Sequence, residues 1–447
     1  MYHVKLNLSH FPAQSDAEVL NITVGDLLRK TAASYPDAVA MVDIADNGDC
    51  GQSWTYGELL EQAEHLAEAL SSRFEAGEKV VVWAPNIPQW IFIEYACGLA
   101  GLVLVTANPS FQVPELKYVI EQSGAVALFM VDEFRGNPMA EIARHAISGN
   151  TALREVVNLE NEDALYATGE RPAVLPNVQP DDAAQIQYTS GTTGFPKGAV
   201  LSHKNLVNNA RLFCTRKQVG PHSVWANFMP LFHTAGCATG ALGCLQAACK
   251  MLLIKTFDAD VFARLIEEQG VTTCFAVPTM LFNLLDSLEK IPRDMSSLKV
   301  ITTGGAPVPP DLVRRVRDRL GCHLLSAFGQ TEHSPMICLN PIEATLEQIV
   351  ETAGQPLPWT EVSIRSPEDN QVLPIGDVGE ICARSYAVMI GYNENPEATA
   401  TAIDSDGWLH TGDLGAMDAK GFVRVTGRVK DMIIRGGENH FPAEIEA

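Results

Sequence analysis

Residues 79–109 read KVVVWAPNIPQWIFIEYACGLAGLVLVTANP, and this stretch decides the fold class of the chain. It begins with a short apolar run at 79–85 and ends with a second one at 101–109, each with the length and composition of a buried strand. The residues between them, 87–100, predict a helix. Strand, helix and strand in this order predict a right-handed βαβ unit in a parallel sheet.

The same alternation continues on both sides of this stretch. Upstream, Thr55 and Glu58 have the spacing of a capping box in front of an amphipathic helix. Downstream, PELKYVIEQSG at 114–124 predicts a helix and AVALFMV at 125–131 predicts a third strand. The first 182 residues are therefore expected to form one α/β subdomain.

A second alternation runs from residue 183 to residue 345. The strand-like QIQY leads into a glycine-rich loop, and a helix is expected to begin near Ser202. Three further apolar runs predict buried strands, namely KMLLI at 250–254, TTCFAVP at 272–278 and KVITTGG at 299–305.

The pattern changes between residues 346 and 429. EVSIRS, GEICARS and GFVRVTG are short strand-like runs separated by Pro, Gly, Asp and Asn, which predicts a small β-rich, barrel-like unit. The expected fold class is thus α/β, with two parallel-sheet α/β subdomains and a smaller β-rich subdomain. The final PAEIEA resembles the start of a helix, so we expect 430–447 to be a hinge and the start of a C-terminal domain that is missing.

Composition excludes several classes of protein. Of the 447 residues, 46% are apolar and 19% are charged, which excludes bulk disorder. The formal charge of −22 disfavours nucleic acid and anionic lipid as partners. The N-terminus does not resemble a signal peptide, no window approaches about 18 uninterrupted apolar residues, and the ten scattered cysteines contain no C-x-x-C. We expect a cytoplasmic protein without membrane insertion, and leave its oligomeric state open, a homodimer included.

The strongest chemical signal is YTSGTTGFPKGAV at 188–200. Its hydroxyl side chains and glycine backbone N–H groups can surround phosphate oxygens, and Lys197 adds a positive charge. The order of residues differs from the Walker A pattern. A thirteen-residue string of this composition favours a phosphate-binding loop over an ordinary polar turn.

Four further strings occur after it in a fixed order: TTGGAPVP at 302–309, SAFGQTE at 326–332, LHTGDLG at 409–415 and GRVKDMIIRGGENHFPAEIE at 427–446. Together with the glycine-rich loop they make the chain resemble the adenylate-forming superfamily of acyl-CoA synthetases, luciferases and adenylation domains. The resemblance covers nearly the whole chain. Its last motif is most similar to that of medium-chain fatty acyl-CoA synthetases.

The resemblance implies a nucleotide site. Phe328 is expected to stack on adenine, Thr331 to meet the α-phosphate, Glu332 to bind Mg²⁺ with help from Thr189, and Asp413 to accept the ribose hydroxyls. The full ATP- and AMP-binding set that it implies is Thr189, Ser190, Gly191, Thr192, Thr193, Gly194, Lys197, Gly305, Ala306, Pro307, Ala327, Phe328, Gly329, Gln330, Thr331, Asp413 and Arg428.

The resemblance also implies an acyl site and a hinge. His233, in MPLFHTAG, is expected near the carboxylate of the substrate, and Lys430 occupies the hinge before a mobile lid. The implied catalytic residues are Thr189, Lys197, His233 and Glu332. The implied acyl pocket consists of His233, Thr234, Gly236, Gly304 and Gly329.

The expected activity is that of an acid–thiol ligase. ATP would convert a carboxylic acid into an acyl adenylate with release of pyrophosphate, and coenzyme A would then take the acyl group with release of AMP. ATP, Mg²⁺ and coenzyme A are the implied cofactors and substrates, and no enzyme nucleophile is needed. Two alternatives stay open at this point: a carrier-protein phosphopantetheine as acceptor, and a truncated chain that binds ATP and acyl adenylate with little turnover.

Overall fold

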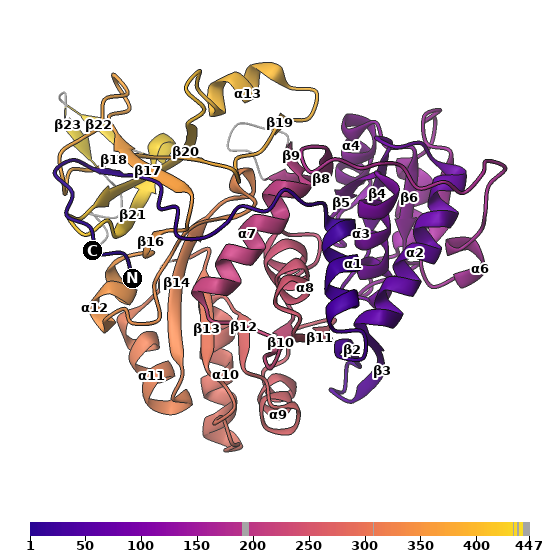
Figure 1. Cartoon of the computed structure of the whole chain (residues 1–447), viewed down its shortest axis with the longest axis horizontal. Coiled ribbons are helices and arrows are strands. Elements are labelled where there is room, and N and C mark those ends of the chain that lie inside the picture. Colours follow the sequence, from indigo (N-terminus) through magenta and orange to yellow (C-terminus); the bar gives the residue numbers. More distant parts are fainter. Residues whose placement is uncertain (190–195, 307, 432, 436–437, 441–447) are drawn as a thin grey trace.

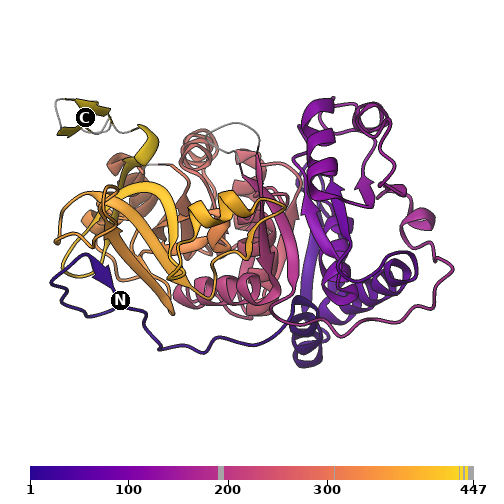
Figure 2. The same ribbon diagram turned by 90° about the horizontal axis from the view of Figure 1, so that it is seen from above.

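The computed structural model of the chain describes residues 1–189, 196–306, 308–431, 433–435 and 438–440. Its strands form a seven-stranded, a nine-stranded and a five-stranded sheet, with a separate two-stranded ribbon (Figure 1). Seen from above, the five-stranded sheet and the seven-stranded sheet lie on opposite sides of the nine-stranded one (Figure 2).

Residues 79–106 fold as a strand, a helix and a strand in the expected order, and both strands belong to the seven-stranded sheet. Five of its strands are parallel to their neighbours, and the two strands at one edge, which come first in the order below, are added by antiparallel pairing. In spatial order the strands are β19 (Gly391–Tyr392), β9 (Lys197–Ser202), β8 (Ala183–Thr189), β5 (Val103–Thr106), β4 (Lys79–Trp83), β6 (Ala127–Met130) and β7 (Glu155–Asn158). The helices from this part of the chain are α2 (Tyr56–Arg73), α3 (Pro88–Ala100), α4 (Val113–Ser123), α5 (Met139–Ala146) and α6 (Glu162–Leu165).

The nine-stranded sheet is parallel at its centre and antiparallel at both edges. In spatial order its strands are β16 (Gln355–Pro356), β15 (Met336–Leu339), β14 (His323–Gly329), β13 (Val300–Gly304), β12 (Thr273–Phe275), β10 (Val224–Asn227), β11 (Lys250–Ile254), β2 (Val39–Ile44) and β3 (Cys50–Thr55). The remaining helices of the two α/β units are α1 (Val24–Ser34), α7 (His203–Arg216), the π-helix η1 (Ala235–Leu242), α8 (Gly243–Ala247), α9 (Ala259–Gln269), α10 (Pro278–Lys290), α11 (Pro310–Leu320) and α12 (Leu346–Glu351).

The five-stranded sheet is antiparallel and has an apolar cluster of its own, which includes Phe11, Val362 and Ile381. In spatial order its strands are β1 (His10–Phe11), β17 (Thr360–Arg365), β18 (Gly379–Ser385), β20 (Leu409–Met417) and β21 (Val423–Arg428). Helix α13 (Pro396–Ala402) precedes β20, and β22 (Ile433–Arg435) pairs with β23 (Glu438–His440). The β-rich unit is therefore confirmed. Within the described residues its sheet is open, with β1 and β21 at the edges, and is not a closed barrel.

Local sequence signals explain several element boundaries. The capping box of Thr55 and Glu58 is present at the start of α2, and Ser202 caps α7. Helix α3 is mostly apolar and is buried along almost its whole length, packed against α1 and α2. One cluster of buried apolar residues joins the cores of the seven- and nine-stranded sheets.

The assignment of strands to sheets differs from the expectation that each sheet is built from one continuous part of the sequence. Strands β2 and β3, within 1–182, belong to the nine-stranded sheet, whereas β8 and β9, after residue 182, belong to the seven-stranded one. Strand β1 pairs with β17 in the β-rich sheet. Local alternation specifies strands but not their partners, so the boundary expected after residue 182 is not a boundary between sheets. The four-part division stays a prediction about domains.

The element after the glycine-rich loop also differs from expectation. The loop leads into strand β9, which pairs with β8 as an antiparallel hairpin before α7 begins. Among the described residues, no helix is both long enough and apolar enough to cross a membrane.

Candidate active site

Three of the expected site residues lie at the carboxyl ends of strands in the nine-stranded sheet. Strand β10 has β11 on one side and β12 on the other, so the strand order reverses there. Ligands of open α/β sheets bind outside the carboxyl ends of strands at such a reversal. His233 comes after β10, Gly304 ends β13 and Glu332 comes after β14, so all three lie at this edge.

Two glycines at this edge allow the backbone to pack closely. A methyl group on Gly304 would lie 2.8 Å from the carbonyl oxygen of Ala327, and one on Gly329 would lie 2.1 Å from that of Pro335. Any larger residue would push these segments apart. The loop after β13 leaves Gly305 and Ala306 exposed.

Glu332 lies in a short 3₁₀ turn, η2 (Thr331–His333), and is only 9% exposed. Its Oε1 accepts a hydrogen bond from the Tyr392 hydroxyl at 2.7 Å, and Thr189 Oγ1 lies 3.4 Å from the same oxygen. The two residues expected to bind Mg²⁺ are therefore in contact, although they are far apart in the sequence.

Lys197 lies on the other side of Tyr392. Its Nζ is 4.9 Å from the centroid of the Tyr392 ring, which is within the range of a cation–π contact. The β8–β9 pairing sets Lys197 opposite Thr189. The structure thus brings Thr189, Lys197 and Glu332 together around one tyrosine.

Asp413 and Arg428, the residues expected at the ribose, contact each other. Arg428 Nε donates to Asp413 Oδ1 at 2.9 Å, across the paired strands β20 and β21. Burial raises the pKa of Asp413, and the Arg428 guanidinium opposes this increase. The negative charge of Glu332 also raises the pKa of Asp413, so the two carboxyl groups lie within electrostatic reach of each other.

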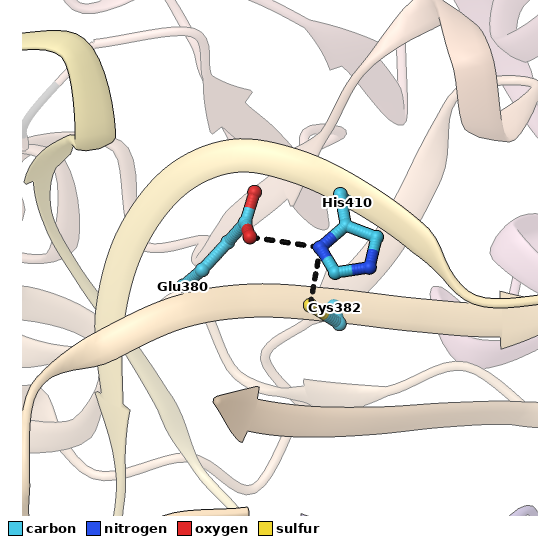
Figure 3. A group of neighbouring side chains, drawn as sticks. All are labelled: Glu380, Cys382 and His410. Atoms are coloured by element: carbon cyan, nitrogen blue, oxygen red, sulfur yellow. Dashed lines mark hydrogen bonds and ion pairs between the residues drawn. The ribbon is translucent and has the colours of Figure 1, made fainter. Parts of the chain in front are cut away.

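Figure 3 shows a polar group formed by Glu380, Cys382 and His410. His410 belongs to β20, the strand that also carries Asp413. His410 Nδ1 donates to Glu380 Oε2 at 2.8 Å and lies 3.5 Å from Cys382 Sγ, and the Gly412 N–H donates to Glu380 Oε1 at 2.9 Å. The three side chains are of types that can bind a metal ion, and their ligand atoms lie within 4.8 Å of one another. Since Nδ1 already carries the proton donated to Glu380, we interpret the group as a brace for the turn that carries Asp413.

His233 is exposed and has a defined tautomer. Its Nδ1 accepts a hydrogen bond from the Ala235 N–H at 3.1 Å, so a neutral ring carries its proton on Nε2. The surrounding protein displaces enough water to lower the pKa of His233 even though part of the ring reaches solvent. His233 therefore presents a neutral N–H donor. Among the described residues, no hydrogen bond or ion pair joins it to Glu332, Lys197 or Asp413.

The π-helix η1 begins two residues after His233. Thr234 and Gly236, expected in the acyl pocket, are buried here. A methyl group on Gly236 would lie 2.2 Å from the carbonyl oxygen of Pro230, so only glycine fits. Helices of this type are rare and occur often at functional sites.

A chain of buried polar side chains connects α3 to this π-helix. Gln185 Nε2 donates to Glu94 Oε1 at 2.8 Å, Gln187 Nε2 donates to Gln185 Oε1 at 2.8 Å, and Cys237 Sγ lies 3.0 Å from Gln187 Nε2. Burial raises the pKa of Glu94 to about 8, so its carboxyl group is mostly protonated at neutral pH. Its Oε2 has no partner among the described residues.

The other expected residues occupy several different environments. Phe328 is half-buried and packs against the apolar cluster of the five-stranded sheet, and its role at adenine stays a prediction. Ala327 is buried, Gln330 and Thr331 are half-buried, and Lys430 is exposed in the turn Val429–Asp431. The predictions for Ser190, Gly191, Thr192, Thr193, Gly194 and Pro307 concern positions outside the described residues.

Sequence reasoning did not identify Tyr392 or the pair of Glu380 and His410. Tyr392 lies in GYNENP, where no local pattern distinguishes it from an ordinary turn residue. Its contact with Glu332 spans 60 positions and depends on β19 joining the edge of the seven-stranded sheet. Only the folded structure supplies that information.

Comparisons with known proteins show what the chain is similar to. Residues 28–393 match the model of the family described as AMP-binding enzyme. The chain is 35% identical over 459 residues to the putative acyl-CoA synthetase YngI of Bacillus subtilis, covering 96% of this chain and 83% of that protein. It is 32% identical to the human mitochondrial medium-chain acyl-CoA ligase ACSF2, covering 95% of this chain and 74% of that protein.

Solved structures of the same kind superpose on the model. Apo MatB from Rhodopseudomonas palustris matches with a TM-score of 0.83 and 28% identity, over 95% of this chain and 82% of that one. The O-succinylbenzoate coenzyme A synthetase MenE from Bacillus subtilis, in complex with AMP, matches with a TM-score of 0.82 and 28% identity, over 96% of this chain and 83% of that one. The chain belongs to the AMP-binding enzyme family, the adenylate-forming acyl-CoA synthetases, and is an acid–thiol ligase.

Proposed function

We propose that the chain joins a medium-chain fatty acid to coenzyme A at the expense of ATP. The acid carboxylate attacks the α-phosphorus of ATP and pyrophosphate leaves, which gives the acyl adenylate. The thiol of coenzyme A then attacks the acyl carbonyl and AMP leaves. The observation that carries the proposal is the contact of Thr189, Lys197 and Glu332 around Tyr392, with Asp413 within electrostatic reach.

The residues present fit a magnesium ion. Glu332 and Thr189 offer a carboxylate and a hydroxyl oxygen 3.4 Å apart, and Mg²⁺ prefers oxygen ligands of these kinds. When bound, the ion would neutralise charge on the phosphates of ATP. The adjacent Lys197 adds a positive charge on the same side.

The other side chains orient the reacting groups. Asp413 accepts hydrogen bonds from the ribose hydroxyls. Arg428 pairs with Asp413 and so lowers the free-energy cost of a charged carboxylate in a buried position. His233 donates its Nε2 proton in a hydrogen bond to an oxygen of the substrate carboxylate and needs no charge of its own to do so. Positioning and charge neutralisation of this type supply most of the catalysis.

No cysteine of the chain is suited to hold a covalent intermediate. Nine of the ten cysteines are buried, and the tenth, Cys50, is exposed in β3 of the nine-stranded sheet, at its edge. Burial raises the pKa of the Cys237 thiol beside the expected acyl pocket, which keeps it protonated and unreactive. The proposal therefore assigns the thiol chemistry to coenzyme A.

The composition of the acyl side supports an aliphatic acid. Residues 233–242 read HTAGCATGAL and contain neither lysine nor arginine, so they offer no partner for a second carboxylate on the substrate. The segment is made mostly of small residues, and nine of its ten residues are buried. The relative ACSF2, named as a medium-chain acyl-CoA ligase, supports the same choice of substrate.

The test is a substrate panel with two acceptors. The chain is incubated with Mg·ATP, one acid at a time (saturated acids of increasing length, benzoate and a dicarboxylate) and either coenzyme A or a phosphopantetheinyl carrier protein. We expect pyrophosphate, AMP and acyl-CoA with medium-chain acids and coenzyme A. Preference for the dicarboxylate would contradict the assigned acid, and transfer to the carrier protein alone would contradict the assigned acceptor.

A further inference from the structure

The segment from Tyr386 to Asn393 crosses from the five-stranded sheet to the seven-stranded one. On the way, the Met389 N–H donates to the Glu332 carbonyl at 2.9 Å and the Ile390 N–H donates to the Val200 carbonyl at 2.8 Å. At its end, the Asn393 N–H donates to the Gly198 carbonyl at 2.7 Å. This crossing segment therefore passes directly over Glu332 and along β9.

Tyr392 is the residue of the crossing segment whose side chain turns into the candidate site. Its hydroxyl donates to Glu332 Oε1 at 2.7 Å, and the ring lies beneath Lys197 Nζ at 4.9 Å. Its backbone is fixed separately, because the Tyr392 N–H donates to Thr399 Oγ1 at 2.8 Å and β19 pairs with β9. The side chain is thus not needed to anchor the segment.

Both contacts join Tyr392 to residues that the proposed function uses. A hydrogen bond to one carboxylate oxygen restricts the rotation of that carboxylate, and so fixes where the other oxygen points. An aromatic face attracts a nearby ammonium group by about 0.5–1 kcal/mol at exposed sites. A carboxylate oxygen can only accept, so the Tyr392 hydroxyl is the donor in this hydrogen bond.

We propose that Tyr392 is a positioning residue that holds the metal-binding carboxylate of Glu332 and the phosphate-binding ammonium of Lys197 in register with each other. Its hydroxyl acts on Glu332 and its ring acts on Lys197. The inference rests on the proposed function, because it assigns Tyr392 to the reaction through those two residues. It predicts that the two effects separate when the hydroxyl and the ring are removed one at a time.

The experiment compares Tyr392→Phe, which keeps the ring, with Tyr392→Leu, which removes both groups. Tyr166→Phe is the matched control, because the Tyr166 hydroxyl makes a similar bond, 2.8 Å to Gln62 Oε1, outside the candidate site. Three quantities are measured for each: the Mg²⁺ concentration for half-maximal activity at saturating ATP, KM for ATP at saturating Mg²⁺, and calorimetric affinities for ATP with and without Mn²⁺. Circular dichroism melting monitors the fold.

We expect Y392F to raise the half-maximal Mg²⁺ concentration roughly ten-fold, the scale of a hydrogen bond to a charged group, while KM for ATP changes little. The calorimetric gain in ATP affinity caused by Mn²⁺ should shrink by a similar factor. Y392L should show the same metal defect and, in addition, raise KM for ATP by about two- to five-fold through loss of the cation–π contact. Y166F should change none of these quantities.

An unchanged metal dependence in folded Y392F would overturn the inference while leaving the proposed function intact. Equal losses in every constant for Y392F and Y392L, or a Y392F chain that unfolds at the assay temperature, would also contradict it, because the side chain would then serve the fold. Wild-type activity that does not depend on Mg·ATP would instead contradict the proposed function itself. The wild-type arm therefore separates the two failures.

Discussion

On the side of the candidate site that we propose for ATP, here called the nucleotide side, Glu332 Oε1 contacts both Tyr392 and Thr189. On the side that we propose for the acid, here called the acyl side, Glu94 Oε1 accepts a hydrogen bond from Gln185, and Glu94 Oε2 has no partner among the described residues. Both carboxyl groups are almost fully shielded from solvent. The partners of Glu332 come from strands of the seven-stranded sheet, while Glu332 itself comes after a strand of the nine-stranded one. Glu94 lies within a single buried helix.

The difference shows how one fold gives two buried carboxyl groups different partners. The nucleotide side concentrates charge where the sheets meet, with Asp413 and Arg428 adding an ion pair. The acyl side consists of small, buried residues, and its carboxyl group is mostly protonated because burial raises the pKa of Glu94 to about 8. We therefore expect mutations of charged residues on the nucleotide side to change activity. We expect mutations on the acyl side to change the choice of acid and the stability of the fold.

The largest expected effect comes from Glu332→Gln. An amide oxygen is a weaker Mg²⁺ ligand than a carboxylate. Mutation of residues that only support metal ligands lowers metal affinity or activity by about 10–100-fold. Since Glu332 is itself the proposed ligand, the rate of pyrophosphate release should fall about 100-fold or more. The melting temperature and the preference among acids should stay unchanged. Steady-state kinetics on the acid panel and thermal melting measure these quantities, with the exposed Glu351→Gln as control. Wild-type rates in E332Q would show that Glu332 does not bind the metal ion.

A somewhat smaller effect is expected from Asp413→Ala. Loss of hydrogen bonds to a charged group should weaken binding of a non-hydrolysable acyl adenylate by roughly 1.5–3 kcal/mol. Calorimetry with the adenylate analogue measures this loss, and the acid alone serves as the comparison ligand, whose affinity should not change. Unaltered affinity for the analogue would exclude Asp413 from the ribose site.

Glu94→Gln should act on stability and its pH dependence. The ordinary pKa is 4.5 and the folded value is about 8, so the folded chain keeps a proton that the unfolded chain has released. The stabilisation is complete below pH 4.5 and decreases as pH rises to about 8, with a slope of up to about 1.4 kcal/mol per pH unit. E94Q should flatten this slope in urea unfolding measured between about pH 5.5 and 7.5, inside the window that the two pKa values define.

The exposed Glu68→Gln on α2 is the control for that experiment. Metal dependence should be the same in E94Q and in the wild type, since Glu94 belongs to the acyl side. If E94Q shifted the Mg²⁺ requirement and left the pH slope unchanged, the division between the two sides would be wrong.

The smallest effect is expected from His410→Gln. The hydrogen bond to Glu380 raises the pKa of His410, so the protonated pair stabilises the fold fully below the ordinary pKa of 6.5 and loses this contribution as pH rises through the folded value. A partly exposed pair of this kind is worth about 0.2–1 kcal/mol. The difference in unfolding free energy between wild type and H410Q should therefore be larger at about pH 5.5 than at about pH 8.5. A constant difference would mean that the brace before Asp413 works without the charge.

Local sequence patterns specify much of this fold, and the resemblance to a known family supplies the residues of the candidate nucleotide site. The apolar runs at 79–85 and 101–109 contain β4 and β5, and the capping box at Thr55 and Glu58 is present at the start of α2. The contacts between distant segments could not be predicted in the same way. Tyr392 reaches Glu332 only because β19 joins β9, and Arg428 meets Asp413 only through the register of β20 and β21. Periodicity identifies strands, but the choice of partner depends on packing of the whole chain.

Strand β1 has a consequence for synthesis of the protein on the ribosome. Phe11 pairs with Val362, so the strand partner of Phe11 is made 362 − 11 = 351 positions later. At about 5–20 residues per second, the wait is roughly 20–70 seconds. During that time the Phe11 ring, fully buried in the finished sheet, lacks the neighbours that β17 and the later strands supply. Strand β1 can therefore join its sheet only after Val362 and the rest of β17 have been made.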